Sequence, residues 1–265
     1  MSTTRSDSEF ELWFRGYRTA APGAPRLLCL PHAGGAAAWY SPLTTALAPR
    51  VRALAVQYPG RQDRYAEPGA ESVHVLADRL FRILESDEGA RDVPTALFGH
   101  SMGAIVAFEL ARRLEAAGRP PAVLIVSGSR APSAPRSATA PADDEALIEE
   151  LTSLGGTDAS LLRDPELLKL FLPALRSDYR ALAAYRRPEG GPLSCPIVAM
   201  VGDRDHQVPA AQVEAWAAET DAEFELRIYP GGHFYLAEQA AAVTAAIEED
   251  LRRFGCLEAV ATGER

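Results

Sequence analysis

Short apolar runs alternate with amphipathic stretches along most of the chain. The runs that predict β-strands are residues 26–30, 51–56, 95–98, 123–126, 196–201 and 223–229. Between and after them, apolar residues recur at helical spacing over residues 73–84, 102–117 and 238–254. Short buried strands that alternate with helices are typical of a mostly parallel sheet with helices on both faces. We therefore predict an α/β fold.

The alternation stops between residues 127 and 195, a gap much longer than the dozen or so residues that a strand-to-strand crossover needs. It begins with a Pro-, Ala- and Ser-rich segment, residues 130–142, that predicts a loop. Asp143 or Asp144 can cap a following helix, and Asp164 can begin a second one that Pro173 should kink or split. We predict one domain over residues 1–265, with a helical lid at about 130–190 over the carboxyl edge of the sheet. A plain surface extension is the alternative.

Composition and charge are those of an ordinary globular protein. Of the 265 residues, 47% are apolar and 24% are charged. The net charge of −9 and the lack of a dense basic run argue against nucleic acids and anionic membranes as partners. The apolar runs are too short to cross a membrane, and the polar start of the chain does not resemble a secretory signal. The odd count of three cysteines favours reduced thiols in the cytoplasm over disulfides or a zinc site.

The most informative motif is the pentapeptide Gly99-His100-Ser101-Met102-Gly103. It follows a predicted strand and begins a predicted helix, which is the setting in which G-x-S-x-G marks a nucleophilic serine. The glycines let strand and helix approach closely around a strained turn, and this turn lifts the serine hydroxyl out of the sheet. The motif therefore predicts Ser101 as a nucleophile.

A serine hydroxyl needs a base to become nucleophilic near neutral pH. Among the five histidines, His233 follows a predicted strand and a Pro-Gly-Gly turn, which places it at the same edge of the sheet as Ser101. An acid should orient this histidine and stabilise its charged form. In the loop after strand 196–201, Asp205 is the favoured candidate and Asp203 is its competitor. The chain order of serine, aspartate and histidine is that of α/β-hydrolases.

An acyl-transfer site also needs backbone donors for the oxyanion. The N–H of Met102 is one candidate, because it lies at a helix N-terminus where the helix dipole favours an anion. The first strand runs into Pro31-His32-Ala33-Gly34-Gly35, whose small residues allow close backbone approach. The N–H of Ala33 is the second candidate, and one such donor is worth about 2.7–4 kcal/mol of barrier. The alternative is that the two glycines serve only a turn.

Five segments of the chain carry a resemblance to a known family. They are LPHAGGAAAWY, QYPGRQDR, FGHSMGAIVAFELARRL, GDRD and GGHFYL. Together they resemble the type II thioesterases, free-standing α/β-hydrolases of polyketide and nonribosomal peptide assembly lines, over roughly residues 14 to 254. The resemblance implies editing: hydrolysis of stalled or aberrant acyl groups from the phosphopantetheine arm of acyl or peptidyl carrier proteins. His206 is a departure, because the family often has proline after the catalytic aspartate.

The predicted lid should shape the choice of acyl group. The candidate pocket residues are large and lie at helical spacing: Leu168, Phe171, Leu172, Tyr179 and Tyr185. Packing onto the sheet is an equally good reading of these residues. Carrier proteins are typically acidic, so docking on this acidic chain would need a local basic patch, for which Arg130 and Arg136 are the candidates.

Two other functions stay open on the residues alone. A carboxylester hydrolase for small esters would use the same catalytic set. A non-catalytic interaction subunit would keep the fold, although the intact Ser101, Asp205 and His233 argue against it. The mechanism needs no metal or redox cofactor, and the single-domain character fits a monomer.

Overall fold

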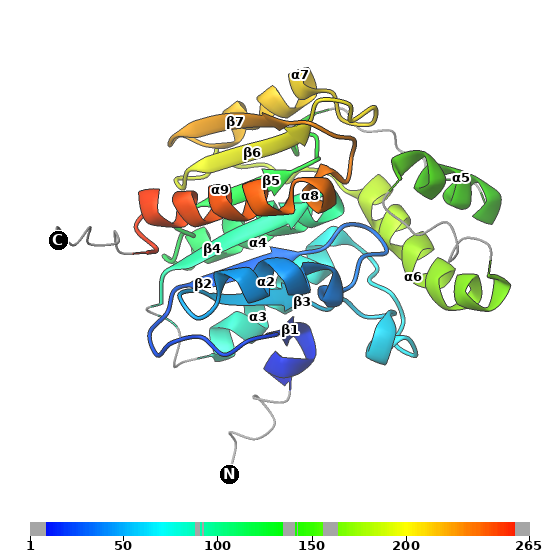
Figure 1. Ribbon diagram of the computed structural model, residues 1–265, viewed down its shortest axis with the longest axis horizontal. Helices are drawn as coiled ribbons and strands as arrows, with labels where there is room; N and C mark the ends of the chain where they lie inside the picture. Colours follow the sequence, from blue (N-terminus) through cyan, green and yellow to red (C-terminus); the bar gives the residue numbers. More distant parts are fainter. Residues whose placement is uncertain are drawn as a thin grey trace, which may run out of the picture.

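A seven-stranded sheet forms the centre of the computed structural model, which describes residues 9–87, 91, 93–134, 141, 143–155 and 164–257 (Figure 1). The strand order is β1-β3-β2-β4-β5-β6-β7, and only β1 pairs antiparallel with its neighbour. The strands are β1 (Phe14–Arg15), β2 (Arg26–Leu30), β3 (Arg52–Val56), β4 (Thr95–His100), β5 (Leu124–Ser127), β6 (Ile197–Gly202) and β7 (Phe224–Tyr229). The predicted mostly parallel sheet is confirmed. The two-residue β1 was missed, because it is too short to show alternation.

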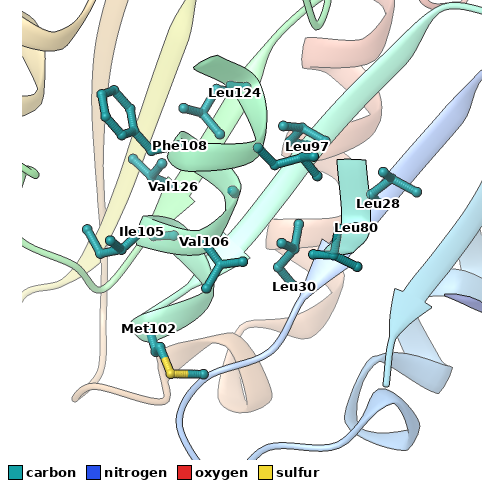
Figure 2. Close-up of a cluster of buried hydrophobic side chains, with 14 of the residues drawn as sticks. Leu28, Leu30, Leu80, Leu97, Met102, Ile105, Val106, Phe108, Leu124 and Val126 are labelled. Carbon is teal, nitrogen blue, oxygen red and sulfur yellow. The ribbon is translucent and has the colours of Figure 1, made fainter. Parts of the chain in front are cut away.

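Helices cover both faces of this sheet (Figure 1). The helices α3 (Val73–Ser86) and α4 (Met102–Ala116) lie on one face, and α2 (Ser41–Leu47) and α9 (Ala240–Arg253) lie on the other. Successive side chains of a strand point to opposite faces, so the side chains of β2 pack in the hydrophobic clusters on both faces of the sheet. Leu28 and Leu30 pack with α3 and α4 (Figure 2), whereas Leu27 and Cys29 pack with α2 and α9. This double burial explains why the strands are apolar throughout.

Two helices occupy the described part of the segment between β5 and β6. They are α5 (Asp144–Leu154) and α6 (Pro165–Ala184), and they stand beside the carboxyl ends of the strands (Figure 1). Asp143 and Asp164 cap them, as predicted: the Asp143 carboxylate accepts one backbone N–H of the first turn of α5, and the Asp164 carboxylate accepts two of α6. Of the kink or split predicted at Pro173, the split is wrong, because α6 continues through this residue. Pro173 is exposed, so the carbonyl that loses its helical hydrogen bond lies on the solvent side.

The described residues also form shorter elements. They are the helices α7 (Ala210–Val213) and α8 (Tyr235–Glu238) and the 3₁₀ turns η1 (Ala37–Tyr40), η2 (Gln62–Arg64) and η5 (Glu214–Glu219). The last predicted helix, residues 238–254, corresponds to α9, and the short α8 before it was not predicted. Most of the predicted loop at residues 130–142 lies outside the described residues. Among the helices that the structure describes, none is long and apolar enough to span a membrane.

Candidate active site

Ser101 occupies the sharp turn between β4 and α4. Its φ of +54° and ψ of −118° lie outside the regions that non-glycine residues favour, and such strain persists mainly at functional sites. Steric crowding requires glycine at both flanking positions, 99 and 103. A Cβ on Gly99 would lie 2.2 Å from the carbonyl oxygen of Gly103, and a Cβ on Gly103 would lie 2.0 Å from that of Leu30. The turn leaves Ser101 half-buried at the carboxyl end of β4.

His233 and Asp205 meet beside this turn. His233 follows β7 through a glycine turn, and its Nδ1 lies 2.7 Å from Oδ2 of Asp205, which follows β6. The other carboxylate oxygen accepts the N–H groups of Gln207 and Val208, at 3.0 and 3.1 Å. Both His233 and Asp205 are 5% exposed. A carboxylate held in this way fixes the imidazole with Nδ1 protonated and leaves Nε2 as its basic nitrogen.

His100 lies between this pair and Ser101. The rings of His100 and His233 have centroids 5.0 Å apart, and His100 directly precedes Ser101 in the chain. The three positions belong to loops at the carboxyl ends of β4, β6 and β7, which share one edge of the parallel sheet. His233 and Asp205 therefore form a pair at the same edge of the sheet as Ser101, and the catalytic roles of the three residues stay a prediction.

Asp203, the competing acid, lies elsewhere. One of its carboxylate oxygens accepts the N–H of Gly231 at 2.9 Å, and its side chain is 52% exposed. This contact ties the β6 loop to the β7 loop without touching the imidazole. His206, the residue that departs from the resemblance, is also exposed.

Two further histidines, His32 and His100, line the inner wall of the site. Nδ1 of His100 lies 3.0 Å from the hydroxyl of Ser127, and the His32 ring packs edge-on against Trp39 and Phe234. Burial lowers the pKa of His32 to about 3 and the pKa of His100 well below its usual value. Both imidazoles are therefore neutral near pH 7 and add no positive charge beside His233.

The candidate oxyanion donors lie on two neighbouring loops. Met102 is the first residue of α4, so its N–H has no acceptor within the helix. Ala33 lies in a tight turn that closes with a 2.9 Å hydrogen bond from the Gly35 N–H to the His32 carbonyl. Gly34 has a φ of +73°, the conformation that the third position of this turn requires. We call residues 31–35 the oxyanion loop.

The candidate pocket residues gather over the oxyanion loop. Leu147 and Leu151 of α5 and Leu172 and Leu175 of α6 form a small buried cluster. The half-buried residues packed against it are Ala33, Ile148, Leu168, Phe171 and Tyr179. Tyr185 differs from these, because it lies in the main core and its hydroxyl donates to Glu109 at 2.9 Å. Four of the five candidates therefore share one apolar cluster that touches the loop.

The candidate docking arginines are only partly described. Arg130 is half-buried, and its guanidinium donates to the carbonyl of Gln207 at 2.9 Å. This contact places Arg130 next to the Asp205 loop. Arg136 lies outside the described residues.

Comparison with known proteins identifies the family. The model of the thioesterase domain family matches residues 25–251. The chain belongs to the thioesterase family. Thioesterase PikA5 of Streptomyces venezuelae is 48% identical over 230 residues, which are 86% of this chain and 81% of that protein. The family assignment makes the chain a thioester hydrolase, and the relatives confirm the predicted resemblance to type II thioesterases.

Solved structures agree with the assignment and confirm the α/β-hydrolase fold. The type II thioesterase BorB from the borrelidin biosynthetic cluster superposes with a TM-score of 0.84 at 49% identity, covering 91% of this chain and 98% of BorB. The type II thioesterase YbtT from the yersiniabactin NRPS/PKS pathway gives a TM-score of 0.79 at 32% identity, covering 89% and 96%.

One feature of this thioesterase was missed by the sequence reasoning. Asp178 of α6 is fully buried and forms a bidentate ion pair with Arg61, at 2.8 and 2.9 Å. Arg61 belongs to the YPGR segment, which served above only as a family signature. A signal was present: Asp178 stands between Leu175 and Ala181 on the buried face of α6, and a carboxylate in an apolar stripe needs a partner. The sequence gives no indication of which cation, 117 positions away, supplies it.

Proposed function

We propose that this thioesterase removes acyl groups from the phosphopantetheine arm of acyl or peptidyl carrier proteins in polyketide or nonribosomal peptide biosynthesis. Its role is editing: it releases aberrant or stalled acyl groups as free acids. The pathways named for BorB and YbtT support this substrate class. The observation that carries the chemistry is the buried His233–Asp205 pair beside the strained turn at Ser101.

In the proposed reaction, the Ser101 hydroxyl oxygen attacks the thioester carbonyl carbon while Nε2 of His233 takes the hydroxyl proton. The N–H groups of Met102 and Ala33 hold the resulting oxyanion. The tetrahedral intermediate collapses with cleavage of the C–S bond, and the imidazolium returns the proton to the departing thiolate. His233 then deprotonates a water molecule that attacks the acyl carbon of the acyl-serine. Collapse of this second intermediate breaks the bond to the serine oxygen, which takes the proton back from His233, and the free acid is released. Asp205 stays ionised and stabilises the imidazolium in both halves.

The substrate reaches this centre past α5 and α6, which we propose act as the lid. In this proposal the cluster of Leu168, Phe171, Leu172 and Tyr179 receives the acyl chain, because it is apolar and packs on Ala33. Arg130 and Arg136 are the proposed contacts for an acidic carrier protein. Salt-insensitive carrier binding would contradict that part of the proposal.

The remaining attributes of the proposal follow from the chemistry. The nucleophile, the base and the oxyanion donors all come from this chain, so the reaction requires no metal or redox cofactor. The three cysteines are buried and free, which favours a cytoplasmic location. We expect the thioesterase to act as a monomer.

The test compares hydrolysis of the same acyl group from a carrier-protein thioester and from an aryl ester. Purified protein should hydrolyse an acyl group from a carrier protein with a higher kcat/KM than the matched aryl ester, and Ser101→Ala should abolish both activities without lowering the melting temperature. Faster turnover of the aryl ester favours the carboxylesterase. A fluorophosphonate probe should label wild type and leave the Ser101→Ala variant unlabelled. An unlabelled, inactive wild type contradicts the proposal and favours the non-catalytic subunit.

A further inference from the structure

We propose that Asp178, together with Arg61, is a positioning residue that holds the oxyanion loop in its working conformation. This inference rests on the proposed function, because it concerns the same site. In the proposed mechanism, neither side chain contacts the substrate carbonyl. Both act through the backbone of the loop that carries the Ala33 N–H.

The first support is direct contact with the loop. Oδ2 of Asp178 accepts the N–H of Gly34 at 2.8 Å. The same oxygen accepts Nη1 of Arg61 at 2.8 Å, and Nη1 also donates to the carbonyl of Gly35 at 3.0 Å. The ion pair therefore holds one donor and one acceptor of the turn that closes around Ala33.

A second support is that the loop is held from its other side by the same segment as Arg61. Gln57 is buried, and its Oε1 accepts the N–H of Ala37 at 2.8 Å. Its Nε2 donates to the carbonyl of Arg61 at 3.2 Å. Residues 57–61, with the sequence QYPGR, thus bind the chain at Gly35 and at Ala37. This gives the two family-typical segments, PHAGG and YPGR, a shared physical role.

The third support is the close fit of α6 on these loops. A Cβ on Gly34 would lie 2.7 Å from the ring of Phe171, and a Cβ on Gly69 would lie 2.4 Å from the hydroxyl oxygen of Ser177. The α6 segment around Asp178 therefore has little room to shift, so the carboxylate presents a fixed acceptor to Gly34.

The charges of the pair also matter for the reaction. A lone carboxylate so close to the oxyanion loop would oppose the negative charge that develops on the substrate oxygen. The bidentate Arg61 cancels this charge, and both side chains are at least nine-tenths buried, so water screens the pair little. Removal of Arg61 alone should therefore harm catalysis more than removal of both charges together.

The same helix offers a matched control pair. Arg176 of α6 pairs with Asp144 of α5 through both oxygens of the carboxylate, and each side chain is about 40% exposed. This pair joins the two helices to each other, and its hydrogen bonds do not involve the oxyanion loop. Asp144→Asn therefore removes a bidentate pair of similar geometry from the same region.

The experiment measures kcat and KM for acetyl and decanoyl thioesters of N-acetylcysteamine, with melting temperatures recorded for every variant. Acetyl offers only one methyl group to the apolar cluster, so it reports mainly on the oxyanion loop. Asp178→Asn should lower kcat by about 10- to 100-fold on both substrates, with KM changed less than about threefold, because small displacements of a catalytic donor cost that much. Arg61→Gln should be worse than Asp178→Asn, and the double variant Arg61→Gln/Asp178→Asn should recover part of the loss. Asp144→Asn should leave kcat for the acetyl thioester unchanged, because the pair that it removes joins only α5 and α6.

Three outcomes overturn the proposal. One is an unchanged kcat for acetyl thioester in folded Asp178→Asn. Another is a rise in KM of Asp178→Asn that is confined to the decanoyl substrate, which would indicate that the ion pair only fixes the position of α6. The third is an Arg61→Gln/Asp178→Asn variant no better than Arg61→Gln. If Asp178→Asn does not fold, Arg61→Lys replaces it, since it keeps the charge but loses the bidentate geometry and should show the same fall in kcat.

The failure of this inference can be told apart from failure of the proposed function. The rate of fluorophosphonate labelling at Ser101 depends on the serine and the oxyanion donors but needs no thioester. If wild type labels but hydrolyses no thioester, the proposed function is wrong. In that case, a 10-fold or greater slowing of labelling in Asp178→Asn still supports the positioning role, and an unchanged rate contradicts it.

Discussion

Replacement of Asp205 by asparagine should leave the fold intact and remove nearly all catalysis. The carboxylate makes two kinds of contact: Oδ1 accepts the N–H groups of Gln207 and Val208, and Oδ2 faces Nδ1 of His233 at 2.7 Å. In Asp205→Asn, the two backbone donors select the amide oxygen, so the NH2 group must face Nδ1. An NH2 donor at that position forces the ring to carry its proton on Nε2. The nitrogen that should take the Ser101 proton is then blocked.

The expected loss of kcat is large because the substitution changes the tautomer of His233 and also removes the negative charge beside it. An Asp→Asn change of this kind in a serine protease triad lowers kcat by about 10⁴-fold, equivalent to about 5 kcal/mol of barrier. We expect a loss of about 10³- to 10⁴-fold here, since His233 and Asp205 are each only 5% exposed and little water can substitute for the carboxylate.

Asp203→Asn is the matched control. An asparagine oxygen can still accept the Gly231 N–H, and the side chain is half exposed, so activity should change less than about threefold. Steady-state hydrolysis of a carrier-bound acyl group by both variants and wild type, with melting temperatures, is the assay. A folded Asp205→Asn variant that keeps more than a tenth of wild-type kcat would contradict the role of Asp205, as would an Asp203→Asn variant that loses more activity than Asp205→Asn.

Two further predictions concern stability and acyl choice. Folding lowers the pKa of His32 from 6.5 to about 3, so the contribution of neutral His32 to stability is complete above pH 6.5 and is lost as pH falls. Between pH 8 and pH 5, the free energy of unfolding measured in urea should therefore fall by about 2 kcal/mol more in wild type than in His32→Gln. Equal falls in the two proteins would contradict this prediction. Phe171→Ala should lower kcat/KM for decanoyl thioester by about 10-fold or more and leave acetyl thioester little changed, because one large buried apolar side chain is worth about 1.5–3 kcal/mol. Leu170→Ala is the control, because Leu170 lies on the same helix and is 57% exposed. An equal fall in kcat/KM for both substrates in Phe171→Ala would show that Phe171 has only a packing role.

Local rules were sufficient for the parts of the site that lie next to strands. Gly99 and Gly103 reveal the turn at Ser101 because the steric need for them is confined to five residues. Asp205 and His233 were predicted because carboxyl ends of parallel strands meet at one edge, so residues far apart in the chain fall together once the strands are known. The helix starts at Asp143 and Asp164 were predicted for the same kind of reason, since a cap is a contact within one turn.

Contacts that no local rule governs were not predicted. Whether α6 is split at Pro173 depends on which face of the helix the proline occupies, and its position on the exposed face is a property of the packed structure. The pairing of Asp178 with Arg61 joins an inserted helix to the loop after β3, and neither periodicity nor spacing specifies that register. Tyr185 looked like Tyr179 in the sequence, yet it packs in the main core and bonds Glu109.

The position of the buried ion pair within α6 limits which part of the proposed lid can change shape. After Pro173, the helix buries Leu175, Asp178 and Ala181 against the body of the protein. Before it, Leu167 and Leu170 are 40% and 57% exposed. Lifting the second half of α6 would expose an ion pair that has lost its water and would release Gly34 at the same time. Because these costs fall on the second half alone, we infer that acyl access is controlled by α5 and the first turns of α6, while the oxyanion loop stays fixed.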